Sequence, residues 1–163
     1  MTTVPHESPT VTLDEIDAKI LEILQRNGRT RRNDLAEKVG LSLPSVSERL
    51  RKLEENRTIT GYYATIDARK LGRDITAFIF VTSDSSKHYT QLVDHAAGLD
   101  EILECHAITG EGSHLLKVRT SNTASLERLL AKIQSWPGVL STRTNLVLST
   151  SKETMRIKVE ATK

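Results

Sequence analysis

From Leu13 onward, apolar residues recur at three- and four-residue steps, which is the period of an amphipathic helix. The predicted apolar stripe of this first helix consists of Leu13, Ile16, Ile20, Ile23 and Leu24. Thr12, followed three residues later by Glu15, predicts a capping box at its start. Gly28, directly after Asn27, predicts its end. The pattern therefore indicates one helix of about three turns.

Two shorter helices are predicted next. The first covers residues 32–39 and ends at Gly40, and the other begins after Ser42, a residue type that caps helices well. Pro44 falls in its first turn, where a missing amide proton costs nothing. Its apolar face is Val46, Leu50 and Leu53, and a second face carries Ser45, Arg49 and Lys52. A packing helix followed by a helix, a short glycine-containing turn and another helix predicts a helix-turn-helix.

After Asn56 the period drops toward two, so residues 59–66 are predicted to form an extended strand. The remaining chain alternates between segments with the helical period of three to four residues and segments with the strand period of two. The predicted strands are 75–81, 102–109, 115–120 and 139–148, with helices at 89–97 and 124–133 and a turn at 110–113. The order βαββαβ is that of a ferredoxin-like domain. Residues 155–159 either add an edge strand or belong to a tail.

The predicted fold class is therefore α+β. We expect a flexible N-terminal arm at 1–11, a helix-turn-helix domain at 12–66 and a linker at 67–73. The ferredoxin-like domain is expected at 74–150, and 151–163 is a tail or an edge strand.

Charge is distributed unevenly along the chain. The net charge is only +2, but the segment from Arg26 to Arg57 holds nine basic and five acidic residues, a net +4. The rest of the chain is therefore at −2. Local basic clusters bind phosphates by displacing counterions, so this asymmetry favours a nucleic-acid partner.

Other features of the composition exclude several classes of protein. Cys105 is the only cysteine, which excludes an intramolecular disulfide and a cysteine-rich zinc site. No apolar run approaches the roughly 18 residues of a membrane helix, and the polar start lacks a signal-peptide core. We expect a cytoplasmic protein that needs neither a membrane nor a cofactor.

The third helix is the predicted DNA reader. A helix about 12 Å wide fits the major groove of duplex DNA. The residues expected to contact double-stranded DNA are Arg31, Arg32, Ser42, Pro44, Ser45, Ser47, Arg49, Arg51 and Lys52. Arg49 is long enough to reach guanine or phosphate, whereas Lys52 and Arg51 are better placed to hold phosphates. On pattern alone, a three-helix packing unit with a solvated basic face remains an alternative.

The ordered motifs resemble the Lrp/AsnC family, the leucine-responsive or feast/famine transcriptional regulators. The resemblance is carried by residues 13–21, Gly28-Arg29, residues 35–42 and 46–54, and Ile59-Thr60-Gly61-Tyr62. It continues through Glu104-Cys105-His106, Thr109-Gly110, Leu115-Leu116 and Pro137-Gly138-Val139. The match covers roughly residues 12–148 in the family's order.

This resemblance implies that 12–66 is a winged-type helix-turn-helix DNA-binding domain joined to an effector-binding and oligomerisation domain at 74–150. It implies homodimers, which often assemble into octamers, and a small effector such as an amino acid. The turn expected to bind that effector contains Thr109, Gly110, Glu111, Gly112, Ser113 and His114. Two departures from the family pattern stand out. Arg57 replaces the glycine that usually follows the recognition helix, so we expect Asn56 to take the left-handed position. The effector turn lacks the usual aromatic residue and second acid.

Other candidate chemistry is interpreted as structural. No histidine pair has metal-ligand spacing. Cys105 and His106 are adjacent on a strand and point to opposite faces, so they cannot form a catalytic pair. Trp136 is expected to anchor the core or an interface. We predict no catalytic residues.

Two alternative functions remain. An architectural, nucleoid-type protein that wraps DNA would use the same basic segment. An enzyme subunit resembling siroheme decarboxylase would use His106, His114 and Arg119 in the C-terminal domain, although the basic recognition helix argues against it.

Overall fold

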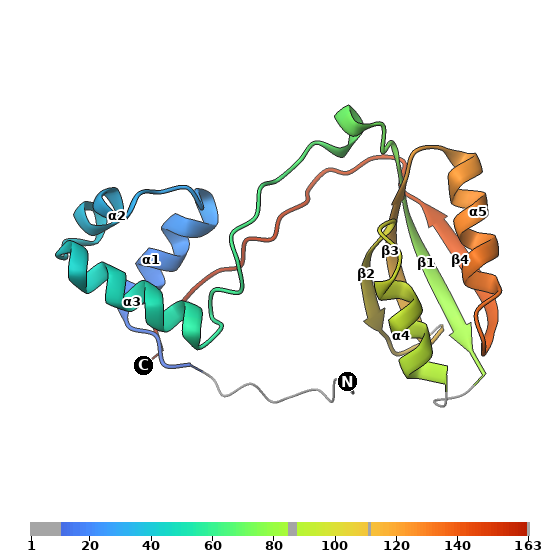
Figure 1. The fold of residues 1–163 in the computed structure, drawn as a ribbon, viewed down its shortest axis with the longest axis horizontal. Coiled ribbons are helices and arrows are strands. Elements are labelled where there is room, and N and C mark those ends of the chain that lie inside the picture. The colour runs from blue at the N-terminus through green and yellow to red at the C-terminus, as the bar shows by residue number, and fades with distance from the viewer. Residues whose placement is uncertain (1–10, 85–87, 111, 163) are drawn as a thin grey trace. The chain divides into compact units, whose positions relative to one another are not determined.

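The computed structural model describes residues 11–84, 88–110 and 112–162 (Figure 1). The chain divides into two units. The helix-turn-helix unit contains the described residues up to Thr65 together with those from Glu153 onward, and the sheet unit is Ile66–Lys152. Because the final segment belongs with the first unit, the chain passes between the units twice.

Three helices form the helix-turn-helix unit: α1 (Glu15–Arg26), α2 (Arg32–Val39) and α3 (Leu43–Glu55). Their apolar faces meet as the helical period predicts. The buried cluster consists of Ile20, Leu21, Leu35, Ala36, Val46, Leu50 and Leu53. The three predicted helices are confirmed, and this core fixes which side of α3 is left exposed.

The ends of these helices differ from the prediction at two places. The capping box of α1 is built by Asp14 and Asp17, whose carboxylates accept from each other's backbone amides at 2.8 and 3.4 Å. The predicted Thr12 and Glu15 pair is therefore wrong by two residues. After α3, Asn56 keeps a φ of −80°, and Arg57 takes the left-handed conformation with a φ of 59°. The expectation for Asn56 is wrong because the helical backbone continues one residue further.

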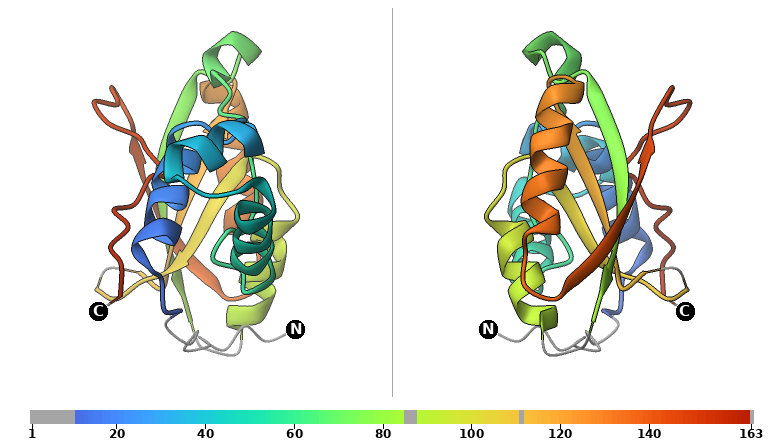
Figure 2. Two further views of the ribbon diagram at one scale, coloured as in Figure 1. Left: turned by 90° about the vertical axis from the view of Figure 1, so that its left-hand side faces the viewer. Right: turned by 90° about the vertical axis from the view of Figure 1, so that its right-hand side faces the viewer.

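The sheet unit contains four antiparallel strands in the order β2-β3-β1-β4. Their bounds are β1 (Ile75–Ser83), β2 (Ile102–Ala107), β3 (His114–Thr120) and β4 (Val139–Leu146). Helices α4 (Tyr89–Ala97) and α5 (Thr123–Gln134) lie on the same face of the sheet (Figure 2). The predicted ferredoxin-like order is confirmed.

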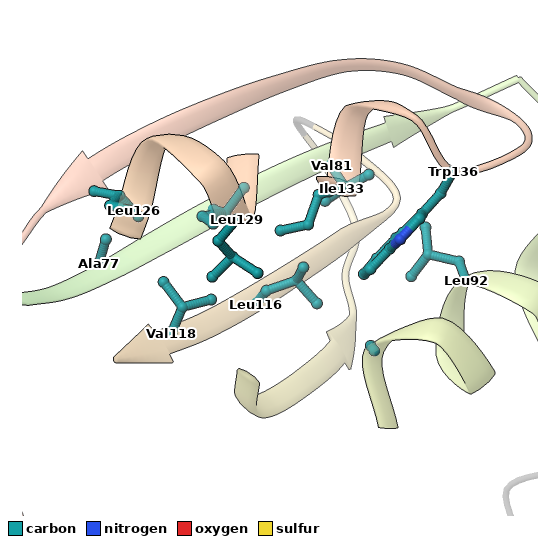
Figure 3. Packing of buried hydrophobic residues seen from close by; sticks show 11 residues of the cluster. Ala77, Val81, Leu92, Leu116, Val118, Leu126, Leu129, Ile133 and Trp136 are labelled. Atoms are coloured by element: carbon teal, nitrogen blue, oxygen red, sulfur yellow. The ribbon is translucent and has the colours of Figure 1, made fainter. Parts of the chain in front are cut away.

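The core of the sheet unit lies between these helices and the sheet (Figure 3). Its buried side chains include Ala77, Val81, Leu92, Leu116, Val118, Leu126, Leu129, Ile133 and Trp136. Trp136 is 7% exposed and stacks on the ring of His95, with centroids 5.5 Å apart. Its predicted role as a core anchor is confirmed. Cys105 packs, half-buried, against the same cluster.

One predicted strand is absent, because residues 59–66 belong to no strand. Residues 155–159, expected as an edge strand or a tail, form no strand either. Residues 68–71 of the predicted linker form a 3-10 turn, η1 (Ala68–Leu71). Alternating polarity favours extended backbone, but a strand also needs a hydrogen-bonded neighbour. No helix in the described ranges is long and apolar enough to cross a membrane.

The C-terminal segment instead packs on α1. The Gln25 side chain donates to the carbonyl of Ile157 at 3.0 Å and accepts from its amide at 2.7 Å. Thr162 donates its amide to the Leu13 carbonyl at 2.8 Å and accepts the Leu13 amide on its Oγ1 at 2.9 Å. Val159 packs against the core of the helix-turn-helix unit. These contacts hold the last residues against α1 and against Leu13, just before it.

Candidate nucleic-acid interface and ligand site

The N-terminal turn of α3 is small, polar and exposed. Ser42 caps the helix, accepting from the Ser45 amide at 3.3 Å, and its hydroxyl lies 2.8 Å from that of Ser45. Ser42, Pro44 and Ser45 are exposed, while Ser47 is half-buried. Pro44 has no amide proton, and the other side chains are short. The turn can therefore approach a surface closely and offer hydroxyl groups to it.

Two of the three cations of α3, Arg51 and Lys52, are paired with acids of the same helix. Arg51 donates to Glu48 at 2.7 and 2.9 Å and to Glu55 at 2.6 Å. Lys52 Nζ lies 3.7 Å from Glu48. The hydrogen bonds from Arg51 lower the pKa of Glu48, and those carboxylates raise the pKa of Arg51. With three cations and three acids, α3 has no net charge.

Arg49 is oriented differently from the other cations of α3. Its Nη1 donates to Asp14 Oδ2 at 2.7 Å and to Asp17 Oδ1 at 2.8 Å, both on α1 or its cap. Its side chain is 29% exposed, against 52% for Arg51. The sequence grouped Arg49 with Ser45 and Lys52 on one face, but the structure directs its guanidinium to α1.

Four arginines lie in or directly beside the turn between α1 and α2. Arg26, Arg29, Arg31 and Arg32 are exposed. Among the residues that the structure describes, none of the four side chains has a hydrogen-bond or ion-pair partner. This turn lies near the C-terminal end of α3, because a Cβ on Gly28 would lie 3.7 Å from Tyr62 Cδ1 and the Tyr62 hydroxyl donates to Glu54 at 2.9 Å.

The predicted effector turn connects β2 and β3. Gly110 and Gly112 have φ values of 93° and 89°, which glycine adopts without strain. A Cβ on Gly112 would lie 3.0 Å from the carbonyl oxygen of Val81. The Ser113 amide and hydroxyl both donate to that oxygen, at 2.8 and 3.1 Å. Thr109 is exposed, and Glu111 lies outside the described residues.

His114 is fully buried behind this turn. Its Nδ1 lies 2.9 Å from Ser113 Oγ, and the Tyr89 ring packs on it with centroids 4.7 Å apart. Within the described ranges His114 Nε2 has no hydrogen-bond partner, and burial lowers the pKa of this histidine. The sequence contains a signal for this burial. His114 lies two and four residues before Leu116 and Val118, so on a strand all three side chains point to the same face.

Other histidines and the cysteine form no further site. His106 Nε2 lies 3.2 Å from Glu104, and burial raises the pKa of the Cys105 thiol. No group of three or more histidine, cysteine or acidic side chains able to hold a metal occurs in the described ranges.

Comparison with known proteins agrees with this two-unit arrangement. Residues 13–60 match the family model described as winged helix-turn-helix DNA-binding, and residues 76–157 match the Lrp/AsnC ligand binding domain. The HTH-type transcriptional regulator FL11 of Pyrococcus horikoshii is 38% identical over 92% of this chain and 99% of its own length. The leucine-responsive regulatory protein of Haemophilus influenzae is 38% identical over 87% of each chain.

Solved structures give the same result. Escherichia coli AsnC superposes with a TM-score of 0.85 at 31% identity, over 91% of this chain and all of that one. The regulator NMB0573 of Neisseria meningitidis, solved as a complex with L-Met, also has a TM-score of 0.85, at 30% identity over 90% of this chain and 96% of that one. The chain belongs to the Lrp/AsnC family of DNA-binding transcriptional regulators.

Proposed function

We propose that this regulator reads double-stranded DNA with the N-terminal turn of α3 while the arginines of the α1–α2 turn hold phosphates. The observation that carries the proposal is that one unit holds both a small, polar, exposed helix start and exposed arginines that have no partner among the described residues. The proposed DNA-contacting residues are Ser42, Pro44, Ser45, Ser47, Arg51 and Lys52 on α3 and its cap, together with Arg31 and Arg32 at the start of α2.

The charge pairing on α3 gives these contacts different roles. Arg51 must exchange Glu48 and Glu55 for a DNA group, so its net gain on binding is small. Arg31 and Arg32 lose no protein partner and contribute counterion release without that cost. We therefore assign affinity mainly to the turn and sequence discrimination mainly to the start of α3.

Selection of bound duplexes from a random library tests this division. The wild-type protein should enrich one motif and prefer it to random duplex by at least about 10³. Ser45→Leu, which places bulk at the exposed start of α3, should remove that preference. Thr123→Leu, at the exposed start of α5, is the matched control and should keep it. An architectural DNA-wrapping protein would enrich no motif, and that result would refute the proposal.

The β2–β3 turn is proposed to bind a small effector of the amino-acid class, with Thr109, Gly110, Glu111, Gly112, Ser113 and His114 as its residues. Support comes from the matched ligand-binding domain and from the Neisseria relative solved with L-Met. Two left-handed glycines also give the turn a backbone that other residues could not follow.

Thermal-shift titration with the individual amino acids tests the effector site. Binding should raise the melting temperature with ligand concentration. Gly112→Ala should abolish the shift, because the added Cβ meets the Val81 carbonyl. Gly98→Ala is the matched control, since its Cβ would meet neighbours only at 3.6 Å, an ordinary contact. An equal ligand-induced shift in both variants would contradict this assignment.

The protein is further proposed to act in the cytoplasm as a homodimer that assembles into higher oligomers such as octamers. The sheet face opposite α4 and α5 carries Phe78 and Phe80, both half-buried, with the Arg143 guanidinium 4.7 Å from the Phe80 ring centroid. A second copy would cover this apolar surface. Analytical ultracentrifugation should show a dimer or a multiple of it, and a monomer at micromolar concentration would refute the assembly.

A further inference from the structure

We propose that Arg49 is a positioning residue that clamps α1 to α3 and does not itself contact DNA. This inference rests on the proposed function, because it concerns how the DNA-reading helix is held.

The contacts of Arg49 form a bridge between two helices. One nitrogen, Nη1, lies within hydrogen-bond distance of both Asp14 and Asp17. The same two carboxylates close the capping box of α1. Asp17 is only 17% exposed, so part of this bridge is shielded from solvent. A single guanidinium therefore joins the start of α1 to the middle of α3.

Helical geometry places Arg49 beside the core and away from the outer surface. At 100° per residue, its Cα direction lies about 70° from the mean direction of Val46, Leu50 and Leu53. The corresponding angles are about 130° for Arg51 and about 170° for Glu48. A surface centred opposite the core thus meets Glu48 before Arg49, and although Arg49 is only about 40° from Ser45, its guanidinium is directed to Asp14 and Asp17.

Electrostatics disfavours releasing Arg49 toward DNA. Moving its guanidinium to a base or phosphate would leave Asp14 and Asp17 without their partner, next to a polyanion. With Arg49 in place, the two carboxylates are partly neutralised. The groove along this flank is lined by both helices, so the start of α1 lies close to the proposed interface. Its residues include Thr12, Asp14 and Asp17 from the start of α1, and Ser45, Glu48, Arg49 and Lys52 from α3. The clamp therefore keeps both the geometry and the charge of that edge compatible with DNA.

A charge-reversal cycle in the full-length protein tests the clamp. Arg49→Asp and Asp17→Arg should each lower the stability of the helix-turn-helix unit and weaken operator binding roughly tenfold, within the coupling range of contacting side chains. The double variant should recover the part of both losses that comes from the Arg49–Asp17 pair, whereas the cap made by Asp17 and the pair with Asp14 stay lost. If Arg49 contacts DNA, the double variant regains stability but not affinity, because an acid then faces the phosphates. That result would overturn the proposal.

Salt dependence gives a second readout that does not require the reversed pair to fold. For Arg49→Gln, the slope of log K against log salt should match the wild-type slope, although affinity falls. Arg31→Gln should reduce the slope by about 0.9, the value for one phosphate contact. A reduction of that size in Arg49→Gln, or loss of preference at one base pair, would refute the clamp. If the wild-type protein binds no duplex, the proposed function fails, and the stability arm of the cycle still decides whether the clamp exists.

Discussion

The helix-turn-helix unit and the sheet unit place their polar chemistry differently. In the described part of the helix-turn-helix unit every buried side chain is apolar, and the charged groups lie at the surface. The sheet unit buries His114 and Thr120 in its interior. Surface charges respond to salt, whereas a buried imidazole responds to pH. DNA binding by the helix-turn-helix unit should therefore depend on ionic strength, whereas the stability of the sheet unit should depend on pH.

The largest expected effect is the loss of stability when a side chain is removed from either hydrophobic core. Trp136→Ala should destabilise the sheet unit by about 3–5 kcal/mol, because it empties the space between Leu92 and Ile133. Leu50→Ala should cost about 2–5 kcal/mol in the other unit. Differential scanning calorimetry of the full chain should show each variant lowering a different transition. One transition that shifts equally in both variants would mean that the units are not independent.

The surface of the helix-turn-helix unit is tested by removing free charge. Arg31→Gln combined with Arg32→Gln should reduce the salt slope by about 1.8 and weaken binding to specific and random duplexes alike. Arg128→Gln, an exposed arginine of α5, is the control and should change neither. Fluorescence anisotropy across a salt series measures both quantities. An unchanged slope in the double variant would show that residues other than Arg31 and Arg32 make the phosphate contacts.

The interior of the sheet unit is tested by pH. Burial lowers the pKa of His114 from its usual 6.5 in the folded state, so between the two values the unfolded chain binds more protons. Stability is therefore full above about pH 6.5 and is lost as the pH falls from there toward the folded-state pKa. Urea denaturation between pH 5 and 8 should show this loss. It should disappear in His114→Leu but persist in His106→Gln, since His106 is exposed.

A smaller effect concerns the C-terminal segment. Gln25→Ala removes both hydrogen bonds to the Ile157 backbone and should cost about 1–2 kcal/mol in the helix-turn-helix transition. Amide hydrogen exchange at Ile157 should accelerate in this variant. Gln91→Ala, exposed on α4, provides the comparison and should leave that amide protected. If Ile157 exchanges at the same rate in both variants, the segment is held by other contacts.

Local signals in the sequence were sufficient for most elements. Residues 32–39 and 89–97 form helices where predicted, because apolar period and helix ends are encoded within a few residues. The α1 cap could not be chosen locally, since Thr12 with Glu15 and Asp14 with Asp17 have the same three-residue spacing. Arg49, far along the chain, contacts the second pair. Likewise, alternation in residues 59–66 cannot supply the partner that a strand needs.

The candidate site divides in the same way. Residue type and spacing predicted which helix carries polar groups, and the exposed Ser42, Pro44 and Ser45 follow from its capping and period. The direction of Arg49 and the pairing of Arg51 depend on side-chain partners that no period specifies. The sequence counted both residues as available positive charge, and the structure shows each in an ion pair.

The smallest effect concerns the left-handed residue after α3. Arg57 adopts a φ of 59°, which costs a residue with a Cβ roughly 1–2 kcal/mol. Arg57→Gly removes that strain but adds backbone entropy to the unfolded chain, worth about 0.4–1 kcal/mol in the opposite direction. We expect a net gain of about 0.5–1 kcal/mol in the helix-turn-helix transition, and none for Arg57→Ala, which keeps the Cβ. Calorimetry of the two variants separates strain relief from loss of the arginine charge, because both lose the charge and only one loses the Cβ. Equal melting temperatures would show that this conformation costs the arginine nothing.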